Sequence, residues 1–284
     1  MMVVMGVKSQ AVLNLARCAH PGPAAGVTVV GLLLSVAAGL DAPRVALVTA
    51  AIATGQLSIG WSNDWRDRHR DASSGRTDKP LAIGAIPGRV VGLAALLAAI
   101  ACVVLSLALG AVPGILHLTA VAAAWAYNFW LKATVASVLP YAVAFGLLPA
   151  FVVAAAPGQP MAPYWLVLSG SLLGAGAHFA NAVPDLDDDL ATGVRGLPHR
   201  IGAGPAAATG AGLLLAATAV LAFWPSGPPG LVGWAALGLA LPAAGLAAAA
   251  GLGPADLRRQ AFAGVVVLAV LDTGLLVLGG ASLG

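Results

Sequence analysis

Long apolar stretches separated by short polar loops constrain this chain more than any other feature. Only 9% of its 284 residues are charged and 60% are hydrophobic, whereas about 25% of the residues in a soluble domain are charged. A helix needs about 20 mostly apolar residues to cross a bilayer, and nine stretches approach that length. They are residues 23–40, 45–60, 90–111, 114–129, 135–156, 164–182, 205–224, 230–250 and 262–283. We therefore predict an all-α, multi-pass membrane helical bundle with about nine transmembrane helices.

The placement of the cations tests this number independently and predicts an orientation. If nine helices alternate across the membrane, thirteen of the fourteen Lys and Arg residues fall on the side of the N-terminus, and only Arg44 falls opposite. Cytoplasmic loops are enriched in Lys and Arg. We therefore predict an integral protein of the cell membrane with its N-terminus in the cytoplasm and its C-terminus outside. The basic excess then reflects topology, so we expect the lipid bilayer as a partner and no nucleic acid.

The chain is predicted to form a single domain over residues 1–284, because no linker is long enough to separate a second one. Residues 1–22 form a cytoplasmic arm, and we expect the first apolar stretch to be retained, not cleaved as a signal peptide. Two loops, residues 61–89 and 183–204, hold eight of the eleven acidic residues, and all eleven are Asp. This exclusive use of the shorter carboxylate indicates a geometric role beyond solubility.

Each loop places several carboxylates on one helical face. In the first loop, Asp64, Asp67 and Asp71 are spaced i, i+3 and i+7, so they share a face if this segment is helical. In the second loop, Asp185 and Asp189 share a face in the same way, together with Asp188. Like charges this close repel one another unless a cation lies between them.

The residue types around these carboxylates indicate which cation and which substrate they bind. Mg²⁺ prefers oxygen ligands and is usually bound through one or two carboxylates, waters and substrate phosphates. The Arg and Lys residues between the carboxylates suit the oxygens of a diphosphate. We therefore predict a metal-bridged pyrophosphate site at the cytoplasmic mouth of the bundle, for a substrate with a charged head and an apolar tail.

The motifs in these loops resemble those of the UbiA-type intramembrane prenyltransferase superfamily, and the similarity runs from about Arg17 to the C-terminus. The first family motif, NDxxDxxxD, is matched by Asn63, Asp64, Asp67 and Asp71. The second motif and its Leu-Pro-x-Arg-x-Gly tail are matched by Asp185, Asp189, Gly193, Leu197, Pro198, Arg200 and Gly202. Two shorter elements are matched by Tyr127, Asn128 and Lys132, and by Arg76, Thr77, Lys79, Pro80 and Leu81. Lys79 departs from the family pattern, because Arg is more common before this Pro.

The resemblance implies ionisation of an allylic prenyl diphosphate and transfer of its prenyl chain to a lipophilic acceptor, aromatic or hydroxyl-bearing. It implies Mg²⁺ as the cofactor, with a central cavity whose mouth carries both Asp-rich motifs. The implied metal ligands, which are also the catalytic set, are Asp64, Asp67, Asp71, Asp185 and Asp189. The implied diphosphate-binding residues are Asn63, Arg66, Arg70, Arg76, Lys79, Lys132, Arg200, Tyr127, Asn128 and Asn181.

Several alternatives stay open at this point. The same ionisation would serve an intramembrane terpene cyclase that needs no acceptor, and a transporter of a divalent cation or a phosphorylated lipid is a third hypothesis. The Arg residues of the first loop can also be topology charges. Asp272, the lone acid in a predicted span, suits a functional role and a hydrogen bond to a neighbouring helix equally well. His20 is close enough to the first span to reach the mouth, but the sequence gives it no role.

Overall fold

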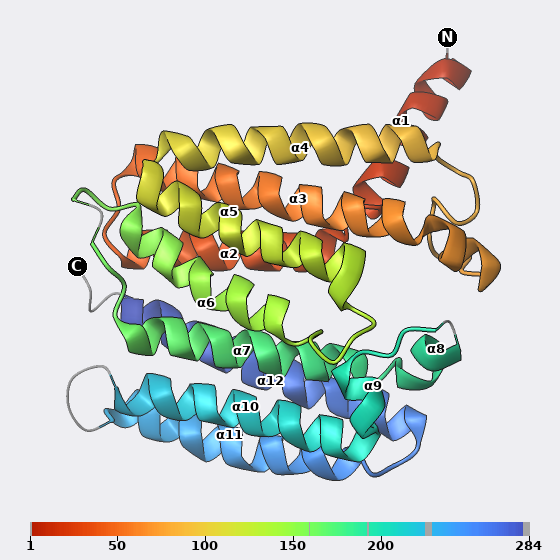
Figure 1. Cartoon of the computed structure of the whole chain (residues 1–284). Helices are drawn as coiled ribbons and strands as arrows, with labels where there is room; N and C mark the ends of the chain where they lie inside the picture. The colour runs from red at the N-terminus through yellow and green to blue at the C-terminus, as the bar shows by residue number, and fades with distance from the viewer. Residues whose placement is uncertain (1, 159, 192, 225–228, 281–284) are drawn as a thin grey trace.

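The computed structural model describes residues 2–158, 160–191, 193–224 and 229–280, and this part of the chain is helical. Its long helices lie side by side in one bundle (Figure 1). The elements are α1 (Met2–Arg17), α2 (Pro21–Ala37), α3 (Ala42–Ser73), α4 (Gly88–Ala108), α5 (Ala111–Ala126), η1 (Tyr127–Leu131), α6 (Leu139–Ala154), α7 (Tyr164–Ala182), α8 (Leu186–Ala191), α9 (Leu197–Ile201), α10 (Ala203–Phe223), α11 (Leu231–Ala250) and α12 (Ala255–Gly280).

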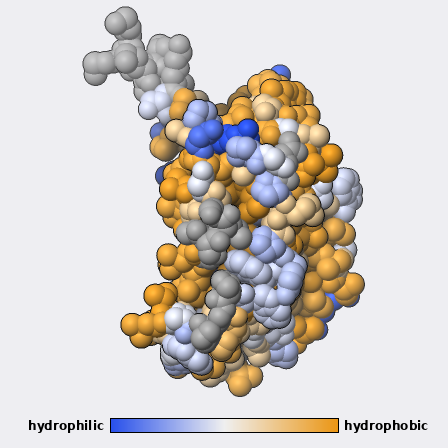
Figure 2. All heavy atoms as spheres, turned by 90° about the vertical axis from the view of Figure 1, so that its left-hand side faces the viewer, coloured by the Kyte–Doolittle hydropathy of each residue, from blue (hydrophilic) through white to orange (hydrophobic). Residues whose placement is uncertain are grey.

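Every predicted apolar stretch corresponds to a helix in the described part of the chain, namely α2 to α7 and α10 to α12. By length and composition, four described helices qualify as membrane spans: α3, α4, α10 and α11. A fifth span results if α1 and α2, which meet at a 69° bend, are taken together. The total of nine spans and the orientation of the termini therefore stay predictions. Figure 2 views the bundle from one end, along its helices, and apolar side chains cover much of what is seen. Large apolar side chains are also exposed along the helices, for example Leu93, Leu97 and Val104 of α4, as expected for a protein surrounded by lipid.

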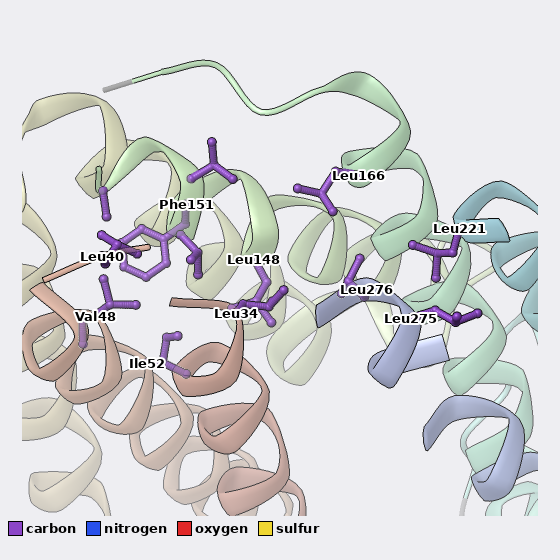
Figure 3. Close-up of a cluster of buried hydrophobic side chains, with 14 of the residues drawn as sticks. Leu34, Leu40, Val48, Ile52, Leu148, Phe151, Leu166, Leu221, Leu275 and Leu276 are labelled. Carbon is purple, nitrogen blue, oxygen red and sulfur yellow. The ribbon is translucent and has the colours of Figure 1, made fainter. Parts of the chain in front are cut away.

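A cluster of buried apolar side chains joins α2, α3 and α6. It includes Leu34 from α2, Ile52 from α3, and Leu148 and Phe151 from α6 (Figure 3). Ile52 precedes the first Asp of the acidic loop by twelve residues, which is about 18 Å along a helix. The part of this cluster around Ile52 thus lies well away from the first Asp motif.

Small residues let α6 and α7 approach closely, as is common between membrane helices. A Cβ atom added to Gly174 of α7 would lie 2.4 Å from the backbone oxygen of Tyr141 in α6. One added to Gly146 of α6 would lie 2.1 Å from Oγ of Ser171 in α7. This contact fixes the position of Tyr141, which faces the cavity described below.

Three elements carry the predicted site residues to one end of the bundle (Figure 1). Helix α3 continues past its apolar part to Ser73, so the first Asp motif is helical. The π-helical turn η1 ends α5 immediately before Lys132, and π-turns often occur at functional sites. Helix α7 ends at Ala182, ahead of Pro184, and the short helices α8 and α9 follow.

Candidate active site

An elongated cavity of about 470 Å³ opens among α2, α3, α5, α6 and α7. Apolar side chains, including those of Val27, Ile52, Val121 and Leu148, line its deep end. Its other end is lined by the polar residues His20, Asn63, Asp67, Arg70, Asp71, Arg76, Lys79, Asn128, Lys132, Asn181 and Asp189. The cavity therefore offers a charged binding region and an apolar binding region in one continuous space.

The three carboxylates of the first motif lie on the buried face of α3. Asp64, Asp67 and Asp71 are 2%, 6% and 4% exposed, whereas Arg66 between them is exposed. The i, i+3, i+7 spacing explains this segregation, because these positions return to one side of a helix. Asp67 and Asp71 line the cavity. Asp64 is not among the lining residues, but its partners His20 and Lys79 are.

Two lysines from other segments balance these buried charges. Lys79 Nζ lies 2.8 Å from Asp64 Oδ1 and 3.2 Å from Asp71 Oδ2. Lys132 Nζ donates to both carboxylate oxygens of Asp67. Arg70 adds a bond of 2.8 Å from Nη2 to Asp67 Oδ2. Burial alone would lower the pKa of Lys79, but the adjacent Asp64 and Asp71 outweigh it and raise that pKa above its ordinary value, so the ammonium stays charged at neutral pH.

The carboxylate oxygens of this region are ligands of the kind that Mg²⁺ prefers, although in this structure they pair with the ammonium groups of Lys79 and Lys132. Among the described residues, no three acidic, His or Cys side chains already converge on one ion-sized position. Asp71 Oδ2 is buried and accepts no hydrogen bond of good geometry within the described chain. Carboxylate oxygens of this kind, next to cationic side chains, suit a hard cation that arrives with a phosphate ligand.

The second motif contributes to the same cavity. Asp189 of α8 lines the cavity beside Asp67 and Asp71, and its Oδ2 lies 3.1 Å from Nε2 of His199 in α9. Tyr127 is within electrostatic range of both Asp67 and Asp189. Asp185 is exposed and outside the cavity lining, and the side chain of Asp188 lies outside the described residues. Asp189 thus shares a cavity with the first motif, whereas Asp185 lies outside the lining but within electrostatic range of Arg76 in the first loop.

The predicted diphosphate-binding residues divide into two groups. Asn63, Arg70, Arg76, Lys79, Lys132, Tyr127, Asn128 and Asn181 line the cavity. Arg66 and Arg200 are exposed and outside its lining, and Arg200 Nε donates to the backbone oxygen of Arg195 at 2.9 Å.

Two of the lining residues also have structural partners. Asn128 Nδ2 donates to the backbone oxygen of Ile59 at 3.0 Å, which ties η1 to α3. Arg76 forms two bonds of 2.8 Å with Asp78. This guanidinium lowers the pKa of Asp78 to about 2, so the pair stays ionised at neutral pH.

Three polar residues of the cavity wall are absent from the set predicted for the site. His20 precedes α2 and contacts Asp64, Gln56 lies in the apolar part of α3, and His117 of α5 lies near the deep end. Gln56 and His117 could have been found as polar residues within apolar stretches, since such residues tend to face the interior of a bundle. His20 carries no periodic signal, because it belongs to a turn.

Other polar residues have partners elsewhere. His178 Nε2 lies 3.0 Å from Ser137 Oγ, which links α7 to the segment that follows η1. The buried Asp272 accepts a bond of 2.5 Å from Thr218 Oγ1. This contact between α10 and α12 agrees with the structural alternative for Asp272.

Aromatic side chains line the cavity between its charged and apolar ends. Tyr127 and Tyr141 meet edge to face, with ring centroids 5.1 Å apart, and Phe145 stacks beside Tyr141 at 6.3 Å. All three rings line the cavity. The π face of an aromatic ring attracts cations, so this wall can stabilise positive charge where the polar region ends.

The chain matches a known protein family and a bacterial relative. The model of the UbiA prenyltransferase family matches residues 24–264. A 4-hydroxybenzoate octaprenyltransferase of Ralstonia nicotianae is 35% identical over 196 residues, which is 67% of this chain and 63% of that protein. The chain therefore matches less than two thirds of the length of this relative.

Solved structures agree on the fold. A UbiA homolog from Archaeoglobus fulgidus bound to GPP and Mg²⁺ has a TM-score of 0.67 at 16% identity, covering 93% of this chain and 99% of that one. The apo structure of a UbiA homolog from Aeropyrum pernix K1 has a TM-score of 0.71 at 18% identity, covering 88% and 97%. Because the family model matches most of the sequence, the chain belongs to the UbiA prenyltransferase family.

Proposed function

We propose that this protein is a Mg²⁺-dependent intramembrane prenyltransferase. It would ionise an allylic prenyl diphosphate and transfer the prenyl chain to a lipophilic acceptor that bears an aromatic ring or a hydroxyl group. The observation that supports this function is the polarity of the cavity. Asp67, Asp71, Asp189 and Lys132 line one end and apolar side chains line the other, which matches a diphosphate head and a hydrocarbon tail.

The relatives support the same substrate class. UbiA homologs from Archaeoglobus fulgidus were solved with GPP or DMAPP and Mg²⁺. The bacterial relative is named for prenyl transfer to 4-hydroxybenzoate, a phenol. We therefore choose prenyl diphosphates as donors and phenols as the first acceptors to test.

The charged residues at the mouth would each have a defined task. Asp67, Asp71 and Asp189 would hold the metal together with Asp64 and Asp185. When bound, Mg²⁺ would act as a Lewis acid on the diphosphate and as a template for it. Lys132, Lys79, Arg70 and other cationic residues of the set predicted from the sequence would offset the negative charge that grows on the leaving group as the C–O bond breaks.

The aromatic and apolar walls would protect the reactive fragment. Heterolysis leaves both bonding electrons on pyrophosphate and a positive charge on the allylic carbon. Tyr127, Tyr141 and Phe145 lie where this charge would form, and their π faces would stabilise it. The apolar walls would exclude water that would otherwise trap the cation. An electron pair of the acceptor would then form the new bond, and the acceptor would lose a proton.

Incubation of purified protein with C10 to C20 prenyl diphosphates tests this function. Each donor is supplied with Mg²⁺ or EDTA, and with or without 4-hydroxybenzoate and other phenols, and the products are identified by mass spectrometry. We expect a prenylated acceptor that forms only with Mg²⁺. A cyclised hydrocarbon formed without acceptor would replace the transferase with a cyclase, and intact diphosphate under all conditions would overturn both.

The placement in the membrane is part of the proposal. The chain would form one domain over residues 1–284. With its N-terminus in the cytoplasm, both acidic motifs would lie on the cytoplasmic side, where water-soluble diphosphates are available. Accessibility of single cysteines introduced at Ser74 and at Ala111 to a membrane-impermeant reagent would test this orientation. Labelling of the Ser74 variant only after cell lysis, with labelling of the Ala111 variant in intact cells, is the expected pattern.

A further inference from the structure

The turn between α1 and α2 holds a residue in a backbone conformation that its side chain disfavours. His20 has φ 51° and ψ 64°, and it is the only described residue other than glycine with a positive φ. The left-handed region is sterically unfavourable for L-residues that carry a Cβ atom. Pro21 follows, and a residue before proline normally adopts an extended conformation. Glycine would adopt this turn without the steric penalty.

Local structure gives no reason for histidine at this position. His20 is the N-cap residue of α2, but its side chain makes no capping hydrogen bond. It reaches instead to α3, where Nε2 lies 2.8 Å from Asp64 Oδ1 and 3.4 Å from Asn63 Nδ2. An ionised carboxylate only accepts hydrogen bonds, so Nε2 carries the proton that is donated to Asp64.

Packing around the turn keeps the disfavoured conformation in place. A Cβ atom added to Gly60 of α3 would lie 2.3 Å from the backbone oxygen of Ala19, so the turn and α3 are in direct contact. Trp61 Nε1 donates to the backbone oxygen of Leu15 at 2.9 Å. A strained backbone persists only where its surroundings determine it, and such strain clusters at functional sites.

We propose that His20 is a positioning residue for the metal site, which acts by holding Asp64. This inference rests on the proposed function. Within the described part of the chain, Lys79 and His20 hydrogen-bond Asp64, and the thiol of Cys18 also lies near this carboxylate. Lys79 belongs to a loop and would turn to a diphosphate oxygen in the loaded site. His20 would then be the partner that keeps Asp64 in place, and the turn between α1 and α2 would be a part of the active site.

The variant His20→Gly separates this role from a structural one. It removes a partner of the buried Asp64, which lowers stability, and it also relieves the backbone strain, which raises stability, so we expect its melting temperature without metal to stay close to that of the wild type. We expect its Kd for Mn²⁺ with inorganic pyrophosphate, measured from the free-ion signal in electron paramagnetic resonance, to rise about 10- to 100-fold, as for other residues that orient metal ligands.

Two further variants serve as controls. His20→Gln keeps an N–H donor and should recover most of the Mn²⁺ affinity. His69→Ala removes an exposed imidazole from α3 and should leave the affinity unchanged. A His20→Gly protein that binds Mn²⁺ as tightly as the wild type would overturn the role of His20 while leaving the proposed function intact. A wild type that binds no Mn²⁺ with pyrophosphate would overturn both.

Discussion

Ion pairing at single residues explains how three aspartates can be buried together on one helix. Isolated carboxylates in this environment would be very costly. Lys79 bridges Asp64 and Asp71, while Lys132 and Arg70 bind Asp67. The same cations are suited to a diphosphate, so one set of side chains can both neutralise the buried carboxylates and bind the substrate.

Replacement of Lys132 tests this double role. Lys132→Met should lower the free energy of unfolding by up to about 3–5 kcal/mol, because it leaves the buried Asp67 with a single partner, Arg70. It should also raise KM for the prenyl diphosphate. Denaturation in detergent and initial rates at varied donor concentration measure the two effects. Lys132→Arg should restore most of the stability, and a Met variant with unchanged KM would contradict diphosphate binding by this residue.

Replacement of Asp67 tests the proposed metal ligand that pairs with both Lys132 and Arg70. Asp67→Asn preserves the side-chain volume but removes the charge, and we expect Mg²⁺-dependent pyrophosphate release to fall about 100- to 1,000-fold, as when a preorganised electrostatic group is lost. Asp256→Asn, an exposed residue of α12, is the matched control and should retain full activity. Equal rates for the two variants would remove Asp67 from the catalytic set.

At the scale of elements, the sequence predicts helices and faces well, and it predicts turns poorly. The spacing of Asp64, Asp67 and Asp71 correctly places them on one face of α3, because helical periodicity is a local property. Pro184 separates α7 from the second motif, and Asp185 and Asp189 belong to the turn that begins α8, where the Asp189 N–H donates to the backbone oxygen of Asp185 at 2.8 Å. Contacts such as that of His20 with Asp64 depend on how turns pack, and the periodicity of the sequence does not predict such packing.

The close contact of α6 and α7 leads to a prediction about these helices. Gly174→Ala would place a methyl group 2.4 Å from the Tyr141 backbone oxygen, so the helices must separate. We expect a loss of about 1–3 kcal/mol in stability and a lower rate, because Tyr141 would shift in the cavity. Gly245→Ala in α11 meets nothing within 4 Å and should be neutral or stabilising. Thermal unfolding of both variants in the same detergent decides between these outcomes.

At the scale of the whole molecule, the bundle combines a charged mouth with an apolar interior. The cavity runs from Asp71 to Ile52 along α3, nineteen positions that span about 28 Å of helix. This length predicts that the donor tail lies parallel to α3. Hydropathy predicts an apolar bundle, and the family resemblance implies a central cavity, whereas the shape of that cavity depends on side chains from five helices and could not be predicted.

The path of the tail can be tested by filling the cavity. Ala144 of α6 lines it, and Ala144→Phe should reduce kcat/KM for a C20 donor more than for a C10 donor, because the longer tail needs the deeper space. Leu97→Phe, on the exposed face of α4, should leave this ratio unchanged. An equal reduction for both donors would contradict a tail that extends along α3.

The most direct test is a structure with Mg²⁺ and geranyl S-thiolodiphosphate, a donor analogue that resists ionisation. It would show whether both acidic motifs bind one diphosphate. We expect the diphosphate to lie between the carboxylates of the first motif and Asp189. Lys132 should contact its oxygens, and the geranyl chain should point toward Ile52. A diphosphate bound away from either motif, or a chain directed out of the cavity, would contradict this expectation.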